Sequence, residues 1–489
     1  RRCSGEALRE DSRKNMIQAP RRRCSMSVSA LAVSLLVAVA SSAAAAAGPP
    51  PALQRVATWS MPEAAVATLV QGTSNGGPAS FPGPSRTSAL LTTFGFGSGD
   101  GVWAMRNLSG VALDPTAAAA TSFVPIDRSI RWPNMARVAP SPLGAAGWGR
   151  GRSLVLAAGG FFPNPTKATG QVVLTDVSDV ANAVSYTLSH PKTSWFYHNA
   201  VWVDVNGDGR LDVVAARAYF PTLPFQHSGG ELVWLEQPPP GPPGAPLNAS
   251  WPERVLISPH GPDVDFVLHD FDGDGTLEVL AGQYFAAKAL TLFWCDAPWA
   301  GCSPDQVHSR EVGGGIGPIF SVSLADLNGD GRLDVLTTTN EADGTGRPYA
   351  VTPPPGNGSA RTGQWGVHPM GPPGYAPRNR LLPGQGGPGK ATAFTIHPGG
   401  PGGAKPAVLL SGDDNGTLCV LTADSPTDPA DWGYSVTRLY SSAKGTIGSP
   451  AVGDVDGDGW ADVLLPSYAE NLVELLTFKP PSPTRDAAA

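Results

Sequence analysis

Short runs of apolar residues alternating with polar ones recur along this chain, and turn-forming residues separate them. Between Asn199 and Ser258 four such runs read NAVWVD, LDVVAAR, ELVWLEQ and ERVLIS. Each run has the length, the alternation and the β-branched or aromatic residues of a strand. We therefore predict four antiparallel strands in this order along one repeating unit.

An acidic motif stands between the first and second runs and occurs four times. It reads D-x-[DN]-x-D-G-x-x-[DE], in VDVNGDGRLDVV, HDFDGDGTLEVL, ADLNGDGRLDVL and GDVDGDGWADVL. Side-chain oxygens at positions 1, 3, 5 and 9, with the backbone carbonyl at position 7, are the kind of ligand set that Ca²⁺ prefers. Glycine at position 6 permits the sharp turn. The expected metal ligands are Asp204, Asn206, Asp208, Arg210 and Asp212; Asp270, Asp272, Asp274, Thr276 and Glu278; Asp326, Asn328, Asp330, Arg332 and Asp334; and Asp454, Asp456, Asp458, Trp460 and Asp462.

Two other interpretations of the motif are weaker. An EF-hand needs Glu at position 12 and a helix after it, whereas this chain has Ala215, Ala281, Thr337 or Leu465 there, followed by strand-like runs. A plain Asp-Gly hairpin turn explains one such loop, but it does not explain four loops that share an acid at position 9. We expect Ca²⁺ as the cofactor, with about four ions.

The motif marks a larger repeat. Its first position falls at residues 204, 270, 326 and 454, so the last interval of 128 spans about two of the earlier units of 66 and 56. A degenerate unit without acids is expected from Ala391, and weaker copies from Gly144 and Ser88. Four short strands per unit and seven units predict an all-β fold, a seven-bladed β-propeller over residues 48–480. Parallel β-helix repeats are much shorter, and independent sandwiches need about 100 residues each.

The two ends of the repeat region are expected to meet. After Val473–Phe478 the chain becomes proline-rich, so the last blade lacks a fourth strand, and residues 481–489 are expected to form a disordered tail. The segment Gln54–Trp59 (QRVATW) resembles ERVLI, and we predict that it pairs beside Val473–Phe478 and closes the propeller. The alternative is an unpaired segment after Pro49–Pro51.

The N-terminal residues 1–47 are expected to be an upstream extension and a signal peptide. Basic residues Arg21–Arg23 precede the apolar run Val28–Ala40 and a stretch of small residues, which is the pattern of a secretory signal. The alternative is an uncleaved anchor. We predict a secreted, extracellular or cell-surface protein without a stable membrane span after cleavage.

Cysteine and asparagine positions agree with that location. Cys295 and Cys302 bracket a short polar loop and are predicted to form a disulfide, whereas Cys419 lies in an apolar run and is expected to be buried. Four N-x-S/T sites are candidate glycosylation positions and support secretion weakly. They are Asn107, Asn248, Asn357 and Asn415.

Composition excludes several classes of protein. The chain has 59 glycines, 50 prolines and only 15% charged residues, which excludes a helical bundle or a coiled coil. Its net charge of −7 lacks the basic footprint of a nucleic-acid-binding protein. The 41% of hydrophobic residues is sufficient for a core, so general disorder is not expected.

The four acidic loops resemble FG-GAP/VCBS repeats, as found in the integrin α-subunit propeller and in secreted seven-bladed propellers that include lectins and sugar-converting enzymes. The strict copies cover about half of residues 48–480, and the weak copies extend the resemblance over nearly all of them. The resemblance implies a propeller whose ligand-binding loops lie on the face opposite the calcium loops. It implies no catalytic residues, because the motif contains none.

Aromatic and polar residues recur where the opposite face is expected. They are Phe162, His198, Tyr219, Asp265, Tyr284, Asn340 and Tyr468. Aromatic surfaces with interspersed polar groups suit a carbohydrate or another polar ligand. The alternative is that these aromatic side chains only cap the packing of the blades.

Two functions from different classes remain. The first is a monomeric binding or adhesion module for a glycan or an extracellular protein ligand. The second is a carbohydrate-active enzyme, of the sugar lyase or dehydratase type, that uses the same face. A paired acid and base at the channel mouth would distinguish the enzyme from the binding module.

Overall fold

The structure is a computed structural model of the 489-residue chain. It describes residues 50–71, 87–97, 99–140, 152–160, 167–219, 229–239, 250–355, 360–379, 385–398 and 405–481. The predicted signal region, most of the predicted tail, and Phe162, Asn248 and Asn357 lie outside these residues. All described residues belong to one compact unit, residues 46–489.

Four-stranded antiparallel sheets repeat along the chain. The first acidic motif lies in a sheet whose strands pair in sequence order, as the sequence predicts: β11 (Trp195–Val203), β12 (Asp212–Tyr219), β13 (Gly229–Leu235) and β14 (Glu253–Ile257). Val203 pairs with Asp212 at one end of β11, and Trp195 pairs with Tyr219 at the other. The acidic loop before Asp212 and the last residue of β12, Tyr219, therefore lie at opposite ends of the sheet.

The other sheets repeat this order. They consist of β2 (Ala64–Val70), β3 (Ser88–Thr93), β4 (Gly101–Met105) and β5 (Val124–Asp127); β6 (Pro133–Val138), β7 (Leu154–Gly159), β8 (Thr169–Asp176) and β9 (Val184–Thr187); β15 (Asp265–His269), β16 (Glu278–Gln283), β17 (Ala289–Trp294) and β18 (His308–Glu311); β19 (Ile319–Ala325), β20 (Asp334–Thr339), β21 (Pro348–Thr352) and β22 (Gly366–Pro369); β23 (Ala391–Phe394), β24 (Ala407–Ser411), β25 (Thr417–Ala423) and β26 (Tyr434–Ser441); and β27 (Ala451–Gly453), β28 (Asp462–Ser467), β29 (Leu472–Thr477) and β1 (Gln54–Ser60). A bridge between Trp195 and Thr169 joins the β6–β9 and β11–β14 sheets into one of nine strands, which also includes β10 (Lys192–Thr193).

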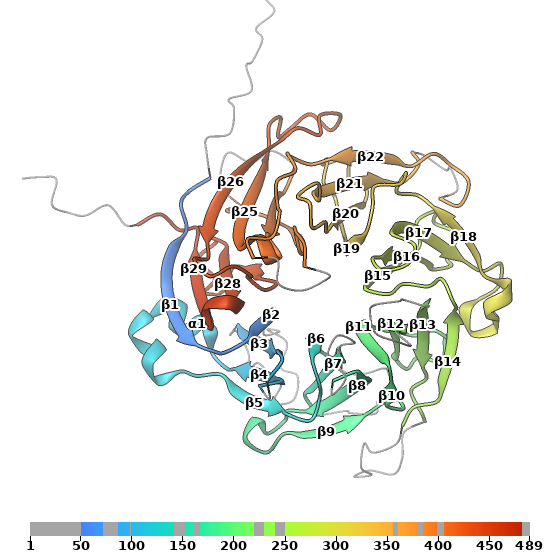
Figure 1. Ribbon diagram of the computed structural model, residues 1–489, viewed down its shortest axis with the longest axis horizontal. Helices are drawn as coiled ribbons and strands as arrows, with labels where there is room; N and C mark the ends of the chain where they lie inside the picture. The colour runs from blue at the N-terminus through green and yellow to red at the C-terminus, as the bar shows by residue number, and fades with distance from the viewer. Residues whose placement is uncertain are drawn as a thin grey trace, which may run out of the picture. The chain divides into compact units, whose positions relative to one another are not determined.

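The sheets follow one another around a common centre, and their first strands, such as β6, β11, β15 and β19, lie nearest to it (Figure 1). Hydrogen bonds connect neighbouring first strands. The Thr68 hydroxyl donates to the Ala136 carbonyl at 3.0 Å, and the Ala67 amide donates to the Ser449 carbonyl at 2.9 Å. The first strands consequently line a shared central space.

The hydrophobic core is divided into clusters between consecutive sheets. Val214 and Trp234 of one sheet, for example, pack with Val279 and Phe293 of the next. The second strands, such as β12, β16, β20 and β28, are buried almost throughout because a neighbouring sheet covers each of their faces. One cluster joins the two ends of the chain, since Ala89 packs with Leu464, Val473 and Ala57.

The predicted pairing between the N-terminal strand and the last sheet is present. Strand β1 runs antiparallel to β29, and their register extends from Gln54 opposite Thr477 to Ser60 opposite Leu472. The exposed Arg55 side chain forms an ion pair with the buried Glu474 carboxylate, with 2.6 Å between Nε and Oε1. The first and last strands of the described chain therefore belong to one sheet.

Two local features differ from the sequence expectations. The weak copy expected from Ser88 starts in the second strand of its sheet, because the first strand is β2 (Ala64–Val70). The helix α1 (Leu108–Leu113) was not predicted, and its Leu108 and Val111 are buried in the cluster that joins the chain ends. The short 3₁₀ segments are η1 (Pro115–Ala120), η2 (Val180–Asn182), η3 (Trp299–Gly301), η4 (Pro304–Gln306), η5 (Asp413–Asn415) and η6 (Tyr468–Glu470). Among the described residues, no helix has the length and apolarity needed to cross a membrane.

Candidate functional site

Each acidic loop joins the first and second strands of its sheet and curls around its first aspartate. In the loop 270–278, the Asp270 carboxylate accepts hydrogen bonds from the amides of Gly273 at 2.7 Å, Asp274 at 3.1 Å and Gly275 at 2.8 Å. Gly273 and Gly275 have φ of 75° and 87°, a backbone region that favours glycine. The same turn forms around the first aspartate of the other loops, so the motif folds in one way throughout.

The acid at position 9 is buried at the base of each loop. Its carboxylate accepts a hydrogen bond from the amide at position 2, as from Phe271 to Glu278 at 2.9 Å. Burial raises the pKa of Asp212, Asp334 and Asp462 to about 6, and it also raises the pKa of Glu278. A cation would offset the cost of burying these carboxylates.

Two of the four loops bring three acids together. In the loop 270–278 these are Asp270, Asp272 and Glu278, whose ligand oxygens lie within 4.8 Å of one another. The loop 454–462 does the same with Asp454, Asp456 and Asp462. These two triads can hold metal ions.

The other two loops have an amide in place of the third acid. Asn206 stands at position 3 of one loop and donates to the Asp208 carboxylate at 3.1 Å, and Asn328 donates to Asp330 at the same distance. The neutral amide oxygen can still bind Ca²⁺, but it adds no charge. These loops would therefore bind a cation more weakly than the two triads.

The residues at position 7 were expected to contribute a backbone carbonyl. Their amides donate to the aspartate at position 5, at 2.9 Å from Arg210, 2.7 Å from Thr276, 2.8 Å from Arg332 and 2.8 Å from Trp460. This contact closes the turn at position 7. Their role as ligands stays a prediction.

A guanidinium group from the next sheet enters one of the triads. Nη2 of Arg361 donates to Glu278 Oε1 at 2.6 Å and to Asp274 Oδ2 at 2.8 Å, and its Nε lies 3.6 Å from Asp272 Oδ2. Arg361 belongs to the connection between β21 and β22, which Arg310 of β18 holds through the Arg361 carbonyl at 3.0 Å. The contact is thus built by two sheets. In the loop 454–462 a cation touches only position 5, where the Lys479 ammonium lies 2.8 Å from Asp458.

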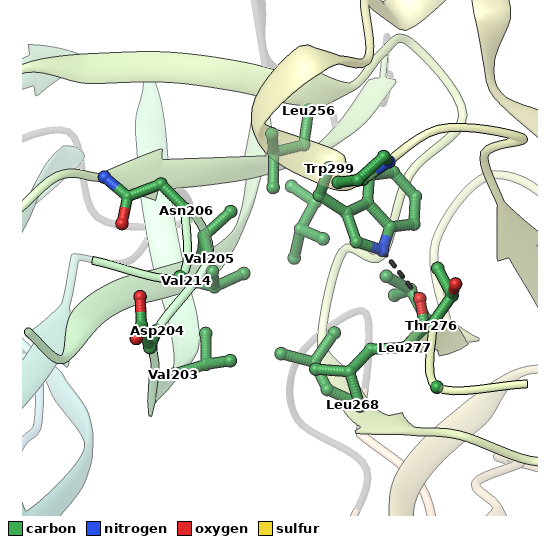
Figure 2. Close-up of a pocket in the computed structure, with 15 residues that line it drawn as sticks. Val203, Asp204, Val205, Asn206, Val214, Leu256, Leu268, Thr276, Leu277 and Trp299 are labelled. Atoms are coloured by element: carbon green, nitrogen blue, oxygen red, sulfur yellow. Dashed lines mark hydrogen bonds between the residues drawn. The ribbon is translucent and has the colours of Figure 1, made fainter. Parts of the chain in front are cut away.

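A pocket of about 400 Å³ lies between the first two acidic loops. Figure 2 shows Asp204 and Asn206 on one side of it and Trp299, Thr276 and Leu277 on the other. The indole of Trp299 donates to the Leu277 carbonyl at 2.7 Å and so fixes that wall. The surface between these two acidic loops is therefore partly apolar.

Aromatic side chains gather at the opposite ends of the first strands. Tyr284 contacts Phe285 and Phe320, with ring centroids 4.8 and 5.8 Å apart, and His198 lies 6.2 Å from Phe320. Burial lowers the pKa of His198 to about 4, so its ring is neutral at pH 7. Tyr219 instead stacks on Trp195 at 5.0 Å, which is the packing role that the alternative interpretation assigns to these aromatics.

A hydrogen-bonded network missed by the sequence analysis lies beside Tyr284. Its hydroxyl donates to Asn340 Oδ1 at 3.1 Å, and Asn340 Nδ2 donates to Asp413 Oδ2 at 3.2 Å. Burial and the neighbouring Asp414 raise the pKa of Asp413 well above its usual range. Asn340 is itself buried, so we assign it a positioning role in this network. Tyr468, another residue of the predicted face, is partly buried, and its ring centroid lies 6.2 Å from that of Phe94.

Two of the predicted ligand-binding residues line a cavity of about 510 Å³ between the first strands. They are His198 and Asp265, and the same cavity is lined by Arg137, Asn199 and Lys390. Asp265 meets other titratable groups here, since its charge acts on the pKa of both Lys390 and Arg137. The sequence indicated Asp265, but it could not show that Arg137 and Lys390 lie in the same cavity.

The remaining described residues that the sequence singled out lie apart from both candidate sites. Cys295 and Cys302 form the expected disulfide, and Cys419 is free and buried. Asn107 begins α1 in a left-handed conformation, and the Asn415 amide donates to the Ala376 carbonyl at 2.8 Å. Glycosylation at these positions stays a prediction.

Comparison with known proteins identifies one of the repeats. Residues 270–337 match the FG-GAP-like repeat family, and this segment runs from the loop of β15–β16 into β20. No curated protein sequence is detectably similar to the chain. A crystal structure of glucose dehydrogenase is similar with a TM-score of 0.37 and 13% sequence identity, covering 72% of this chain and 98% of that chain. The chain thus contains an FG-GAP-like repeat within an all-β architecture of four-stranded antiparallel sheets.

Proposed function

We propose that this chain is a secreted, calcium-stabilised β-propeller that binds a glycan or an extracellular protein at the end opposite its acidic loops. The observation that carries the proposal is one acidic loop geometry repeated in four sheets, with two of the four loops, 270–278 and 326–334, inside the FG-GAP-like match. The disulfide between Cys295 and Cys302 supports an oxidising location. We expect a monomer.

The sheets form seven blades in a closed ring. The nine-stranded sheet counts as two blades, because a single bridge links its two four-stranded halves. Closure is supported by the β1–β29 pairing and by the bridge between Val66 and Ser449, which joins the first blade to the last. A closed ring leaves no sheet edge between its two ends open to other chains.

Calcium is the metal that suits the loops best. Each loop offers carboxylate oxygens from flexible side chains around a curled backbone, whereas Mg²⁺ demands a small regular octahedron and gives up water reluctantly. The residues at positions 1, 3, 5 and 9 would hold the ion, and its charge would relieve the repulsion between their carboxylates. The expected number is about four ions, with the triads of the loops 270–278 and 454–462 offering most charge.

Calcium should therefore raise the melting temperature markedly, and magnesium should not. Titration calorimetry counts the ions, and Asp456→Asn should remove one ion and part of the thermal shift. Asp343→Asn is the matched control, because Asp343 caps an exposed turn outside the loops through Thr345. Equal melting temperatures in EDTA and in millimolar Ca²⁺ would contradict calcium stabilisation.

The ligand is proposed to bind at the aromatic end of the central cavity. His198, Tyr284 and Phe320 present an aromatic wall there, and Asp265 adds a polar group. A glycan array with and without EDTA tests both parts of the proposal. Binding to a defined glycan class that EDTA abolishes supports the proposal. An array without binding speaks against a glycan, and the protein ligand is then tested by capture of extracellular proteins with and without EDTA.

The alternative function is a carbohydrate-active enzyme of the lyase or dehydratase type at the same end. Two observations favour it: Asp265 and Lys390 share one cavity, and the partly buried Asp413 is linked through Asn340 to the Tyr284 hydroxyl. Chemical turnover of a glycan that the array identifies would establish the enzyme. Loss of turnover in Asp413→Asn with binding retained would assign Asp413 to the chemistry.

A further inference from the structure

A belt of hydrogen bonds crosses four first strands inside the central cavity. Nη2 of Arg137 in β6 donates to Asn199 Oδ1 in β11 at 2.9 Å, and Asn199 Nδ2 donates to Asp265 Oδ1 in β15 at 2.6 Å. The Val322 amide in β19 then donates to Asp265 Oδ2 at 2.8 Å. Each of the four strands contributes one residue, so the position of these groups depends on how the strands are arranged around the cavity.

Neutral donors satisfy the carboxylate of this belt. Asp265 Oδ1 accepts from Asn199 and also from the Phe266 amide at 2.9 Å, while Oδ2 accepts from Val322. Within the described part of the chain, neither Arg137 nor Lys390 forms an ion pair. Two cationic side chains therefore share the cavity with one carboxylate, whose oxygens already accept hydrogen bonds from neutral amides.

Two positive charges stand beside one carboxylate in this cavity. Lys390 directly precedes β23, lines the cavity and stays accessible to solvent. The protein atoms around it lower the pKa of its ammonium, and Asp265 opposes the shift. Burial also lowers the pKa of Arg137, again against Asp265. Among the described residues that line the cavity, Asp265 is the one carboxylate, so Arg137 and Lys390 leave one positive charge in excess.

The size and the lining of the cavity limit what can neutralise this charge. Its volume of about 510 Å³ admits a molecule of monosaccharide size, and Val201, Val267 and Phe320 give it apolar walls. A dianion such as phosphate would replace one excess positive charge by one excess negative charge. A monoanion leaves the cavity neutral, and a carboxylate matches the paired donors of a guanidinium.

We propose that Arg137 and Lys390 bind the carboxylate group of a small organic acid in the central cavity. The inference rests on the proposed ligand-binding role of this end of the molecule and names the chemistry of the ligand. The Lys390 ammonium and the remaining N–H groups of Arg137 donate to the two carboxylate oxygens, and Asn199 and Asp265 hold Arg137 in position. The carbon skeleton of the ligand lies along the apolar walls.

The test uses the calcium-loaded full chain and three probes at constant ionic strength, with affinities measured by titration calorimetry. The probes are D-glucuronate, the size-matched neutral D-glucose, and acetate. D-Glucuronate should bind at least about tenfold more tightly than D-glucose. Lys390→Met should weaken D-glucuronate binding about tenfold or more, Lys390→Arg should keep it within about threefold, and the exposed Lys444→Met should leave it unchanged.

The outcomes separate this inference from the proposed function. Equal affinity for D-glucuronate and D-glucose overturns the carboxylate inference and leaves glycan binding in place. Binding of acetate as tight as that of D-glucuronate, and sensitive to Lys390→Met, supports the carboxylate site and speaks against a sugar ligand. No binding of either acid, in protein that calcium stabilises normally, overturns the inference while the glycan array still tests the function.

Discussion

The side chain of Arg361 distinguishes the loop 270–278 from the other acidic loops. Its guanidinium contacts Glu278 and Asp274 and lies near Asp272, where a metal ion would bind. Arg361 and Ca²⁺ should therefore compete for the same carboxylates. A guanidinium also relieves the repulsion between these carboxylates when metal is absent.

Arg361→Met should raise the calcium affinity of this loop about tenfold, because Ca²⁺ no longer has to displace a bound cation. The melting temperature without metal should fall, and that with saturating Ca²⁺ should change little. Titration calorimetry and thermal melts measure both effects. Arg332→Met is the control, since the Arg332 guanidinium donates to the Pro354 carbonyl, and only its backbone amide, which the substitution keeps, donates to Asp330. Weaker calcium binding in Arg361→Met would show that Arg361 orders the ligands instead of competing.

His198 should make stability depend on pH. Its pKa is about 4 in the folded protein and 6.5 as the ordinary value, so between these values the unfolded chain binds a proton that the folded chain does not. This histidine therefore costs no stability above pH 6.5, and stability falls as the pH drops from 6.5 towards 4. Urea unfolding should show that the free energy of unfolding decreases less between pH 7 and pH 5 in His198→Gln than in the wild type. In the control His308→Gln, at an exposed position, the free energy of unfolding should decrease between pH 7 and pH 5 by as much as in the wild type.

The acidic loops could be predicted because the motif that forms each of them is contained in nine consecutive residues. The backbone turn around Asp270 and the buried Glu278 follow from that spacing alone. Arg361 and Arg137 could not be assigned in this way, because sheets distant in sequence bring them to their partners. Asp413 was missed for the same reason, since its partner Asn340 is 73 residues away.

At the scale of strands and loops, the disulfide closes the connection after β17. Cys295 and Cys302 are buried in the cluster that contains Trp299, and they are seven residues apart. Loop closure of this length restricts the unfolded chain and contributes about 2 kcal/mol to stability. The bridge thus fixes the wall that Trp299 gives to the pocket between two acidic loops.

The double variant Cys295→Ala, Cys302→Ala should lower the free energy of unfolding by about 2 kcal/mol. Denaturant titration of oxidised protein measures the difference, and a reductant should bring the wild type to the same value. Mass spectrometry of native protein alkylated without reduction should find Cys295 and Cys302 unmodified. Alkylation of both under these conditions would refute the bridge in solution.

Strands were predictable where an acidic loop marks the boundary between the first and second strands. The alternation in β11 and the loop before Asp212 place all four strands of that sheet. In the first sheet the connection between β2 and β3 has no such motif, so β2 was not assigned to it. Helix α1 was not expected because six residues are too few to show a helical period.

At the scale of the whole molecule, stability should depend on the pairing of β1 with β29. Removal of residues 51–60 uncovers β29 and the cluster that contains Val473 and Leu464. The melting temperature should fall by several degrees in one cooperative transition, because the first and last four-stranded sheets lose their shared packing. Differential scanning calorimetry measures this, with removal of residues 482–489 as the control. A shortened chain that melts like the full one would refute closure.

The pairing of β1 with β29 also has a consequence for biosynthesis. The Glu63 amide, just after β1, donates to the Asn471 side chain 408 residues later. The first of the described strands to emerge during translation therefore waits for the last of them. Until then β1 is an unpaired edge, and its exposed Arg55 and Thr58 discourage association with other nascent chains. A product that terminates before β29 lacks the partner of β1 and leaves part of the cluster around Ala57 uncovered. It should be recognised as incomplete and degraded by quality-control proteases.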